Sequence, residues 1–483
     1  DTLGEGMIGQ TQLFGTAAMM DRLQIPPGRY LNEHADLLND HVMFSGQPPQ
    51  RKVAINLYGH EAGAQKFSVF VTEGQPKGAV LMQTDAGRPI VSRQATGKGE
   101  TLFVNLPLTY LKQRTDGLFM ASMLRYFVQD MLQWPRLANT PDAVGGIVLN
   151  WHNDAQPALP SLEVLEEAGI FKEGPFSFHF TAGPDVDAPG DGKGMNLPGN
   201  PQAQAMIRQF QAQGHAVGDH GGWIHNYFGR NINENNQADY EHYLDLNREA
   251  TSSVLGQATR EYSAPDGNTT AWTLRWLERN QYLGLYLTGD IGMGPTRTWL
   301  NDDRLSPSLW FFPVLTMGEI ATAEEVTMQK VPIELYTDWL LAVGQFVERH
   351  QTVRLVYFHP PGAEMVLPAV TAFVEQVAAC RQAGRCRWFT MTQMAEYLNR
   401  RDAVQWQWQP GSQADVLQAS DAKDLAQMAW WVPAQRYGKP QVLAGQAEVD
   451  GYGSNWRVRA TGGKTLEVRL PHLNPAGHTP SKR

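Results

Sequence analysis

The sequence has no excess of positive charge and no long apolar run. Lys and Arg number 40 against 49 Asp and Glu, which gives a net charge of −9. Without surplus cations to neutralise phosphates, we expect no nucleic-acid partner. No stretch approaches the ~18–20 uninterrupted apolar residues that a membrane-spanning helix needs, and the mean hydropathy is −0.38. We therefore expect a soluble chain without a membrane span.

Cysteine is also scarce. The two cysteines, Cys380 and Cys386, lie six positions apart in AACRQAGRC. Across a helix end and a turn this separation permits a disulfide, which suits an oxidising compartment, and two buried free thiols are the alternative. The chain begins at Asp1 and not at Met, which leaves both a removed leader and a longer parent chain open.

The rest of the composition is that of a globular protein. Hydrophobic residues make up 42% of the chain and charged residues 18%, with 46 Gly and 30 Pro, which excludes disorder, collagen and coiled coil. The length of 483 residues predicts about three domains. We place them at 1–142, where strands lead into a helix, at 143–402, where short apolar runs alternate with amphipathic helices, and at 403–483, where a period-2 pattern indicates a small antiparallel β domain. The predicted class is α/β, with a central (β/α) wheel or barrel.

Polar residues gather where the predicted strands of the middle domain end. Loops at the carboxyl ends of parallel strands converge, so ligands bind there. The residues that follow these strands are His152, Asn153 and Asp154, then Asp219, His220 and His225, then Asp290, and finally His359.

One carboxylate and two imidazoles from successive strand ends form a mixed oxygen and nitrogen set. Such a set suits Zn²⁺ or a similar divalent ion with open positions for water. Asp154, His220 and His225 are the predicted metal ligands. Each histidine taken alone is more typical of a hydrogen-bonded structural residue, and it is their occurrence together that favours a metal site.

The stretch from about 145 to 400 resembles the polysaccharide deacetylase family, carbohydrate esterase family 4 with the NodB-homology domain. LNWHNDA stands where that family has TFDDG, and GHAVGDHGGWIH matches its H-[ST]-x-x-H motif and lead-in. SAPDG corresponds to the family motif R-x-P-x-G, and LVYFH corresponds to the family motif L-x-x-H. The four motifs occur in the family's order over roughly half the chain. The resemblance implies a distorted (β/α) barrel of the deacetylase type.

The resemblance also implies roles for single residues. Asp154, His220 and His225 match the metal ligands, and His359 matches the general acid that protonates the leaving amine. A metal polarises the acetamide carbonyl and lowers the pKa of bound water to about 7. An imidazole can then pass a proton to the departing nitrogen.

Three positions depart from the family pattern. The catalytic-base aspartate is replaced by Asn153, whose amide cannot accept a proton from water, and the arginine that orients the base is replaced by Ser263. Five steps instead of four separate His220 from His225, so the Gly-rich loop between them must bulge. His152 shares a strand face with Asp154 and is our candidate for a replacement base, with a fourth metal ligand as the alternative. The other candidate bases are Asp219, Asp266 and Asp290, and a turn or helix cap is as good an interpretation of Asp290.

Sugar sites combine flat apolar surfaces with polar groups. Trp223 lies between the two histidines in a polar, Gly-rich loop, and Asn153, Pro265 and Asp266 complete the set that we predict to contact substrate. The amide-rich loop that follows is compatible with glycan hydrogen bonds or with a turn-rich surface.

The end of the first domain, GETLFVNLPL with the helix after it, resembles class I glutamine amidotransferase-like domains, which have a Rossmann-like layer. That catalysis requires a cysteine nucleophile, and no cysteine precedes Cys380. We interpret the domain as a structural or glycan-binding accessory.

These observations lead to a metal-dependent deacetylase of an exported amino-sugar polysaccharide, periplasmic or secreted, with zinc as cofactor. The implied partners are the polysaccharide and other components of a polysaccharide secretion system. A non-catalytic glycan-binding protein that lost its base at Asn153 is the first alternative. A hydrolase of another amide or ester is the second, because barrel and metal do not specify the acyl group.

Overall fold

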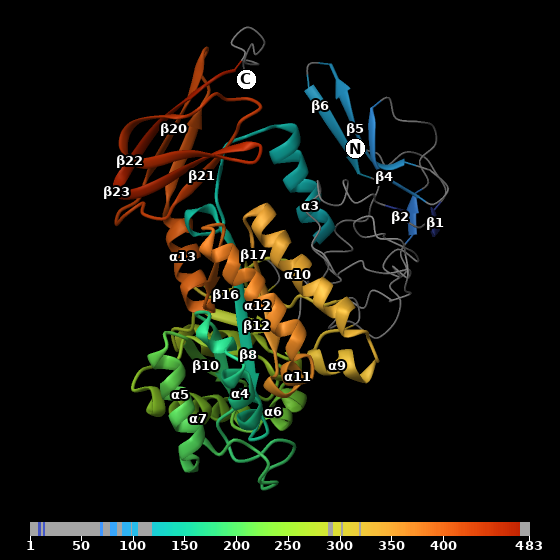
Figure 1. The fold of residues 1–483 in the computed structure, drawn as a ribbon, viewed down its shortest axis with the longest axis vertical. Coiled ribbons are helices and arrows are strands. Elements are labelled where there is room, and N and C mark those ends of the chain that lie inside the picture. The colour runs from blue at the N-terminus through green and yellow to red at the C-terminus, as the bar shows by residue number, and fades with distance from the viewer. Residues whose placement is uncertain are drawn as a thin grey trace.

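The structure is a computed structural model. It describes residues 8–10, 13–14, 68–70, 78–84, 89–97, 99–104, 118–287, 293–300, 303–317 and 320–473. The larger sheets within these ranges have nine, six and four strands, and Figure 1 shows the six-stranded sheet and the helix-covered nine-stranded sheet at opposite ends of the view.

The nine-stranded sheet has the order β13–β16–β12–β11–β10–β9–β8–β17, and β18 also pairs with β8. Its neighbouring strands are parallel, apart from the antiparallel pair β13–β16. The strands are β8 (Gly145–Asn153), β9 (Ser177–Phe180), β10 (Ala216–His220), β11 (Glu261–Ser263), β12 (Gly284–Leu287), β13 (Thr296–Arg297), β16 (Trp310–Pro313), β17 (Val353–Phe358) and β18 (Cys386–Phe389).

Helices alternate with these strands along the chain. They are α4 (Ala158–Glu167), α5 (Pro201–Ala212), α6 (His225–Asn231), α7 (Gln237–Leu255), α8 (Ala271–Arg279), α9 (Ala323–Met328), α10 (Ile333–His350), α11 (Pro360–Met365), α12 (Leu367–Gln382) and α13 (Met391–Ala403). The prediction of an α/β fold is confirmed.

The strand β8 shows how the sheet is buried on both faces, as parallel sheets are. All nine of its residues are buried. Ile147, Leu149 and Trp151 belong to the core between the sheet and the outer helices. Val148 belongs to a second core with inward-facing residues of β12, β16 and β17, so the sheet curls around its own interior.

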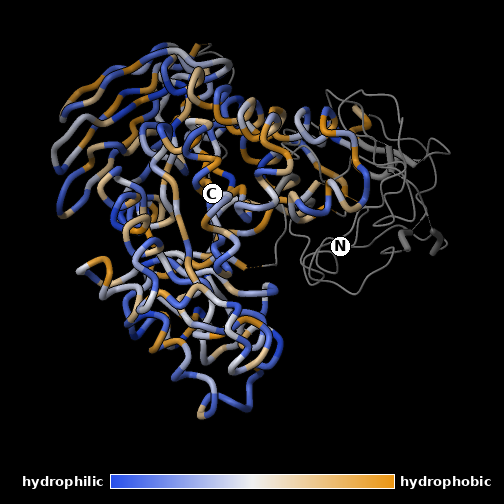
Figure 2. Tube along the Cα trace, turned by 60° about the horizontal axis from the view of Figure 1, so that its bottom comes forward, coloured by the Kyte–Doolittle hydropathy of each residue, from blue (hydrophilic) through white to orange (hydrophobic). Residues whose placement is uncertain are grey.

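The C-terminal part of the chain forms the six-stranded antiparallel sheet. It contains β19 (Gln405–Gln409), β20 (Ala414–Ser420), β21 (Ala429–Pro433), β22 (Gln441–Tyr452), β23 (Asn455–Pro471) and, from far earlier in the sequence, β7 (Arg136–Leu137). Buried residues alternate with half-buried ones along β20, as the period-2 pattern predicts. Figure 2 shows hydrophilic and hydrophobic residues mixed along the strands of the sheet. The predicted domain limits at 142 and 402 stay predictions.

The described N-terminal strands form two small antiparallel sheets. One pairs β1 (Ile8–Gln10) with β3 (Ser68–Phe70), and the other contains β2 (Leu13–Phe14), β4 (Ala79–Thr84), β5 (Pro89–Thr96) and β6 (Gly99–Val104). The helix α3 (Leu118–Tyr126) follows and runs into a π-helical turn, Phe127–Met131. Much of residues 1–117 lies outside the described residues, so the amidotransferase-like resemblance stays a prediction. A separate hairpin joins β14 (Trp299–Leu300) to β15 (Asp303–Arg304).

Two further findings concern the cysteines and the lengths of the helices. Cys380 at the end of α12 and Cys386 at the start of β18 form a disulfide, which decides between the two alternatives left by the sequence. None of the helices in the described ranges is long and apolar enough to cross a membrane.

Candidate metal and acid–base site

The site lies at the carboxyl ends of three parallel strands. Asp154 follows the last residue of β8, and His220 is the last residue of β10. His225 is the first residue of α6, and His359 lies between β17 and α11. The parallel pairing of these strands brings residues 205 positions apart in the sequence to one edge of the sheet.

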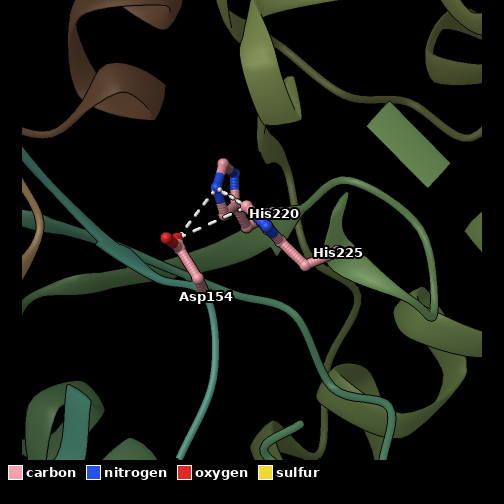
Figure 3. A group of neighbouring side chains, drawn as sticks. All are labelled: Asp154, His220 and His225. Carbon is pink, nitrogen blue, oxygen red and sulfur yellow. Dashed lines mark hydrogen bonds and ion pairs between the residues drawn. The ribbon is translucent and has the colours of Figure 1, made fainter. Parts of the chain in front are cut away.

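The side chains of Asp154, His220 and His225 converge (Figure 3). Asp154 Oδ1 lies 3.1 Å from His220 Nε2 and 3.5 Å from His225 Nε2, and the two Nε2 atoms are 2.8 Å apart. One ligand atom from each residue therefore lies within 4.8 Å of the other two. Two imidazole nitrogens and a carboxylate oxygen form the donor set that suits Zn²⁺ with positions left for water and substrate. The residues fit a divalent metal.

The loop between the histidines takes up the extra residue through Gly221. Its φ is +68°, a left-handed conformation that favours glycine. A Cβ at Gly221 would lie 2.2 Å from Cγ of Pro265, so the loop also needs the absence of a side chain there. With this loop conformation, the imidazoles of His220 and His225 lie side by side despite the five-step spacing.

Electrostatics keep Asp154 and His220 in forms that bind metal. Burial opposes the charge on Asp154, but His225, His359 and His220 together lower the pKa of its carboxyl well below the usual value. Burial lowers the pKa of His220 to about 4, against the opposing effect of Asp154. At neutral pH the site therefore offers a carboxylate and an uncharged His220, as metal binding requires.

His359 is charged differently from His220. Its Nε2 lies 3.7 Å from Asp154 Oδ2, and its Nδ1 lies 3.4 Å from the carboxylate of Glu324. Burial alone would lower the pKa of His359, but Asp154 and Glu324 outweigh it and raise the pKa to about 9. His359 is therefore protonated at neutral pH.

Sequence reasoning missed Glu324. The residue lies in the first turn of α9, which Thr322 and Glu325 cap, and it reaches His359 across 35 positions of sequence. Gly362 makes room for it, because a Cβ there would lie 2.3 Å from the Glu324 carboxyl carbon. The capping-box pattern TAEE predicts only the helix start. Nothing local in the sequence indicates the partner.

His152 lies beside the metal group but is not part of it. Its ring centre is 4.4 Å from that of His220 and 5.6 Å from that of His359. Burial lowers the pKa of His152 well below its usual value, so the ring is neutral. Its Nε2 is buried and has no hydrogen-bond partner among the described residues. The ring is thus neutral, the form in which an imidazole nitrogen can accept a proton.

The residues that we predict to contact substrate differ in how deeply they are buried. Asn153 is fully buried, and its Nδ2 donates to the carbonyls of Trp151 and His179. Trp223 is half-buried and packs against the outer core. Pro265 is buried under Gly221, while Asp266 is exposed and lies 3.6 Å from Arg230. Their contacts with substrate stay predictions.

The remaining candidate bases are Asp290 and Asp219. Asp290 lies outside the described residues. Asp219 is buried, and its carboxylate accepts hydrogen bonds from Asn247, Thr259 and Tyr282. These bonds involve both of its oxygens and favour a role for Asp219 in the packing of β10, and its role as a base stays a prediction.

Comparisons with known proteins give a partial likeness. No protein-family profile matches the chain, and no curated protein matches it. A candidate polysaccharide deacetylase from Mycobacterium smegmatis aligns with 54% of this chain and 93% of its own at 17% identity and a TM-score of 0.37. A family 4 acetyl xylan esterase from Clostridium thermocellum, solved with a cobalt ion, aligns over 52% and 91% at 14% identity and a TM-score of 0.29.

Other chemistries appear among the similar structures. A 4-alpha-glucanotransferase from Thermococcus litoralis aligns with 52% of this chain and 40% of its own at 11% identity and a TM-score of 0.36. At such identities and TM-scores these likenesses carry no argument about activity. The proposal below therefore rests on the geometry of the site.

Proposed function

We propose that the protein is a metal-dependent hydrolase that removes N-acetyl groups from an amino-sugar polysaccharide. The observation that supports this is the convergence of Asp154, His220 and His225 beside His359, an imidazole that two carboxylates keep protonated. Hydrolysis of an amide needs an electrophile for the carbonyl, a nucleophilic water and an acid for the leaving nitrogen. The site has a candidate for each.

Asp154, His220 and His225 would hold the metal, and the donor set favours zinc. Such an ion supplies a Lewis acid that polarises the amide carbonyl and activates water at neutral pH. His225 is oriented for this role, since its Nδ1 lies 2.8 Å from Asn226 Oδ1, which leaves Nε2 turned toward Asp154.

His359 is the proposed acid and His152 the proposed base. Protonated His359 donates its Nε2 proton to the leaving nitrogen, while its Nδ1 proton stays on the side of Glu324. The unpartnered Nε2 of His152 accepts the proton of the attacking water in place of the aspartate that Asn153 has replaced.

Export to the periplasm or beyond is part of the proposal. The disulfide between Cys380 and Cys386 supports it, because disulfides persist in oxidising compartments. A polysaccharide substrate and other components of a polysaccharide secretion system remain the partners that we propose.

The first experiment combines elemental analysis with an acetate-release assay on N-acetylated amino-sugar polymers. We expect about one zinc-like ion per chain, activity that a chelator abolishes and Zn²⁺ restores, and loss of both in His220→Ala. His359→Ala should keep the metal and lose ~10²–10⁴-fold in turnover. His242→Ala, an exposed histidine of α7, serves as the control. Full activity after complete metal removal would contradict the mechanism.

A glycan-binding protein without turnover is the second candidate, favoured by Asn153. The structure makes Asn153→Asp a sharper test than the sequence alone did, because a carboxylate would face the carbonyls that now accept from Nδ2. If His152 is the base, this variant loses about 1–3 kcal/mol of stability and gains no turnover. Polymer binding without acetate release by the parent chain, and acetate release by Asn153→Asp, would support the second candidate.

A further inference from the structure

A chain of buried hydrogen bonds reaches the metal group from behind. Glu261 Oε2 lies 3.2 Å from His179 Nε2, and His179 Nδ1 lies 2.9 Å from Ser263 Oγ. Ser263 Oγ in turn lies 2.6 Å from His220 Nδ1. All four residues are at most 2% exposed. This hydrogen-bond chain is therefore shielded from solvent along its length. It leads from the Glu261 carboxylate to the His220 ring, whose other nitrogen faces Asp154.

The directions of all the hydrogen bonds in this chain follow from the protonation state of Glu261, its first member. Burial raises the pKa of the Glu261 carboxyl, but hydrogen bonds led by that of His179 outweigh burial and lower it, so Glu261 is a carboxylate and can only accept. His179 must then carry a proton on Nε2, and a ring with this single proton presents a lone pair at Nδ1. Ser263 donates its hydroxyl proton to that lone pair and accepts from His220 Nδ1. His220 is left with its lone pair on Nε2, the atom 3.1 Å from Asp154.

The sheet is built to let this chain cross a strand. His179 lies on β9 and its two partners lie on β11, with β10 between them. Gly218 of β10 is paired with His179, and a Cβ there would lie 2.8 Å from His179 Cδ2 and 2.9 Å from Glu261 Cβ. The imidazole thus passes over a position where only glycine fits.

We propose that Glu261, His179 and Ser263 are positioning residues that fix His220 in the tautomer able to bind a metal. This rests on the proposed function in that it takes His220 as a ligand. It gives Ser263 a task of its own, where the resemblance led us to expect an arginine that orients a catalytic base.

The test measures Zn²⁺ affinity by chelator competition in Ser263→Ala and Glu261→Gln. Partners of metal-binding histidines typically account for ~10–100-fold in affinity, and we expect losses in that range for both variants. Glu261→Gln is informative because its amide can donate toward His179 and so reverse the chain. Asp219→Asn is the matched control. Asp219 is an equally buried carboxylate one residue before His220, and its hydrogen-bond partners are Asn247, Thr259 and Tyr282, none of which belongs to the hydrogen-bond chain. Its link to that chain is electrostatic, since burial raises the pKa of Asp219 and His179 acts to lower it. We expect this control to lose stability and keep its affinity.

A second readout uses ¹⁵N chemical shifts of the imidazoles in the metal-free protein. The parent should show His220 protonated at Nδ1, and the two variants should show a mixture of tautomers or the reverse one. The carbonyl of Ser263, 3.2 Å from His220 Nδ1, is the competing acceptor. Parent-like affinity and tautomer in both variants would show that the carbonyl suffices and would overturn the proposal, as would an equal affinity loss in Asp219→Asn. A parent chain that binds no Zn²⁺ would contradict the proposed function, whereas the tautomer readout tests the inference in either case.

Discussion

His359 owes its charge to carboxylates from two different elements, Asp154 after β8 and Glu324 on α9. Of these, Glu324 lies outside the metal group, so its effect on the acid can be removed without touching a ligand. Because its pKa is raised to about 9, His359 is protonated below about pH 9 and loses its proton above that pH. Activity that depends on the acid should therefore fall as the pH rises through this value.

Glu324→Gln should move this alkaline fall to lower pH. An opposite charge within ~4–6 Å raises the pKa of a histidine by ~1–3 units, so the midpoint should drop by about that amount. The measurement is the pH profile of acetate release, with kcat and KM reported separately and metal content checked. Glu325→Gln is the comparison, because Glu325 is the next residue of α9, its carboxylate caps the helix start, and it raises the pKa of His359 less than Glu324 does, so that its shift should be smaller. Equal shifts in both variants would contradict the role of Glu324.

Some residues of the site could be predicted from the sequence, and others could not. Asp154, His220 and His359 lie at or just after the ends of predicted strands, and His225 lies just after the loop that follows one of them, so the rule that ligands gather at strand ends locates them. Glu324, Glu261 and His179 carry no such signal. Glu324 opens a helix, and the other two lie within strands whose register decides what they touch. Only the paired strands show that His179 passes over Gly218.

The element that decides the site is the loop from β10 to α6, since it sets where His225 lies relative to His220. Its four residues include Gly221 with φ +68°, packed against Pro265. The five-step spacing and the glycines predict a bulge. They do not predict its direction, which depends on the Ser263–Gly267 segment beneath it.

Gly221→Ala should weaken metal binding by displacing this loop. The new Cβ would meet Pro265 at 2.2 Å, and the left-handed conformation adds a cost of ~1–2 kcal/mol for any other residue. Gly256→Ala is the matched control, because Gly256 has the same φ of +68° at the end of α7 with nothing within 4 Å of its Cβ. We expect similar strain in both variants but a loss of Zn²⁺ affinity and turnover only in Gly221→Ala, measured by chelator competition and acetate release. Unchanged affinity in Gly221→Ala would show that the loop is not what places His225.

At the scale of the whole molecule, local patterns predicted the elements but not all of their partners. The alternation of runs between 143 and 402 predicts the β/α order, and the period-2 tail predicts antiparallel strands. Two pairings join segments that are far apart in the sequence. β7 joins the C-terminal sheet from position 136, and β18 returns to pair with β8 from 241 positions away. Such long-range pairings leave no trace in a local pattern.

The nine-stranded sheet separates a stabilising end from the end that carries the site. Cys386 pairs with Gly145 at the start of β8, whereas Asp154 follows the last residue of that strand. The disulfide with Cys380 closes a loop of only a few residues at the far end of β8 from the metal group. Bonds at one end of such a sheet contribute to stability, and residues at the carboxyl end contribute to chemistry.

Replacing both cysteines by serine should therefore affect stability and activity unequally. Closing so short a loop restricts the unfolded chain by an amount equivalent to about 2 kcal/mol, and we expect a loss of that size in thermal or urea unfolding of Cys380→Ser/Cys386→Ser. Metal content and acetate release should match the parent at temperatures where both are folded, because no residue of the metal group contacts the bond. Parent protein treated with reductant provides the control, since it loses the bond without a change in side-chain composition. A variant that keeps its stability but loses its metal would show that the two ends of the sheet are coupled, contrary to this separation.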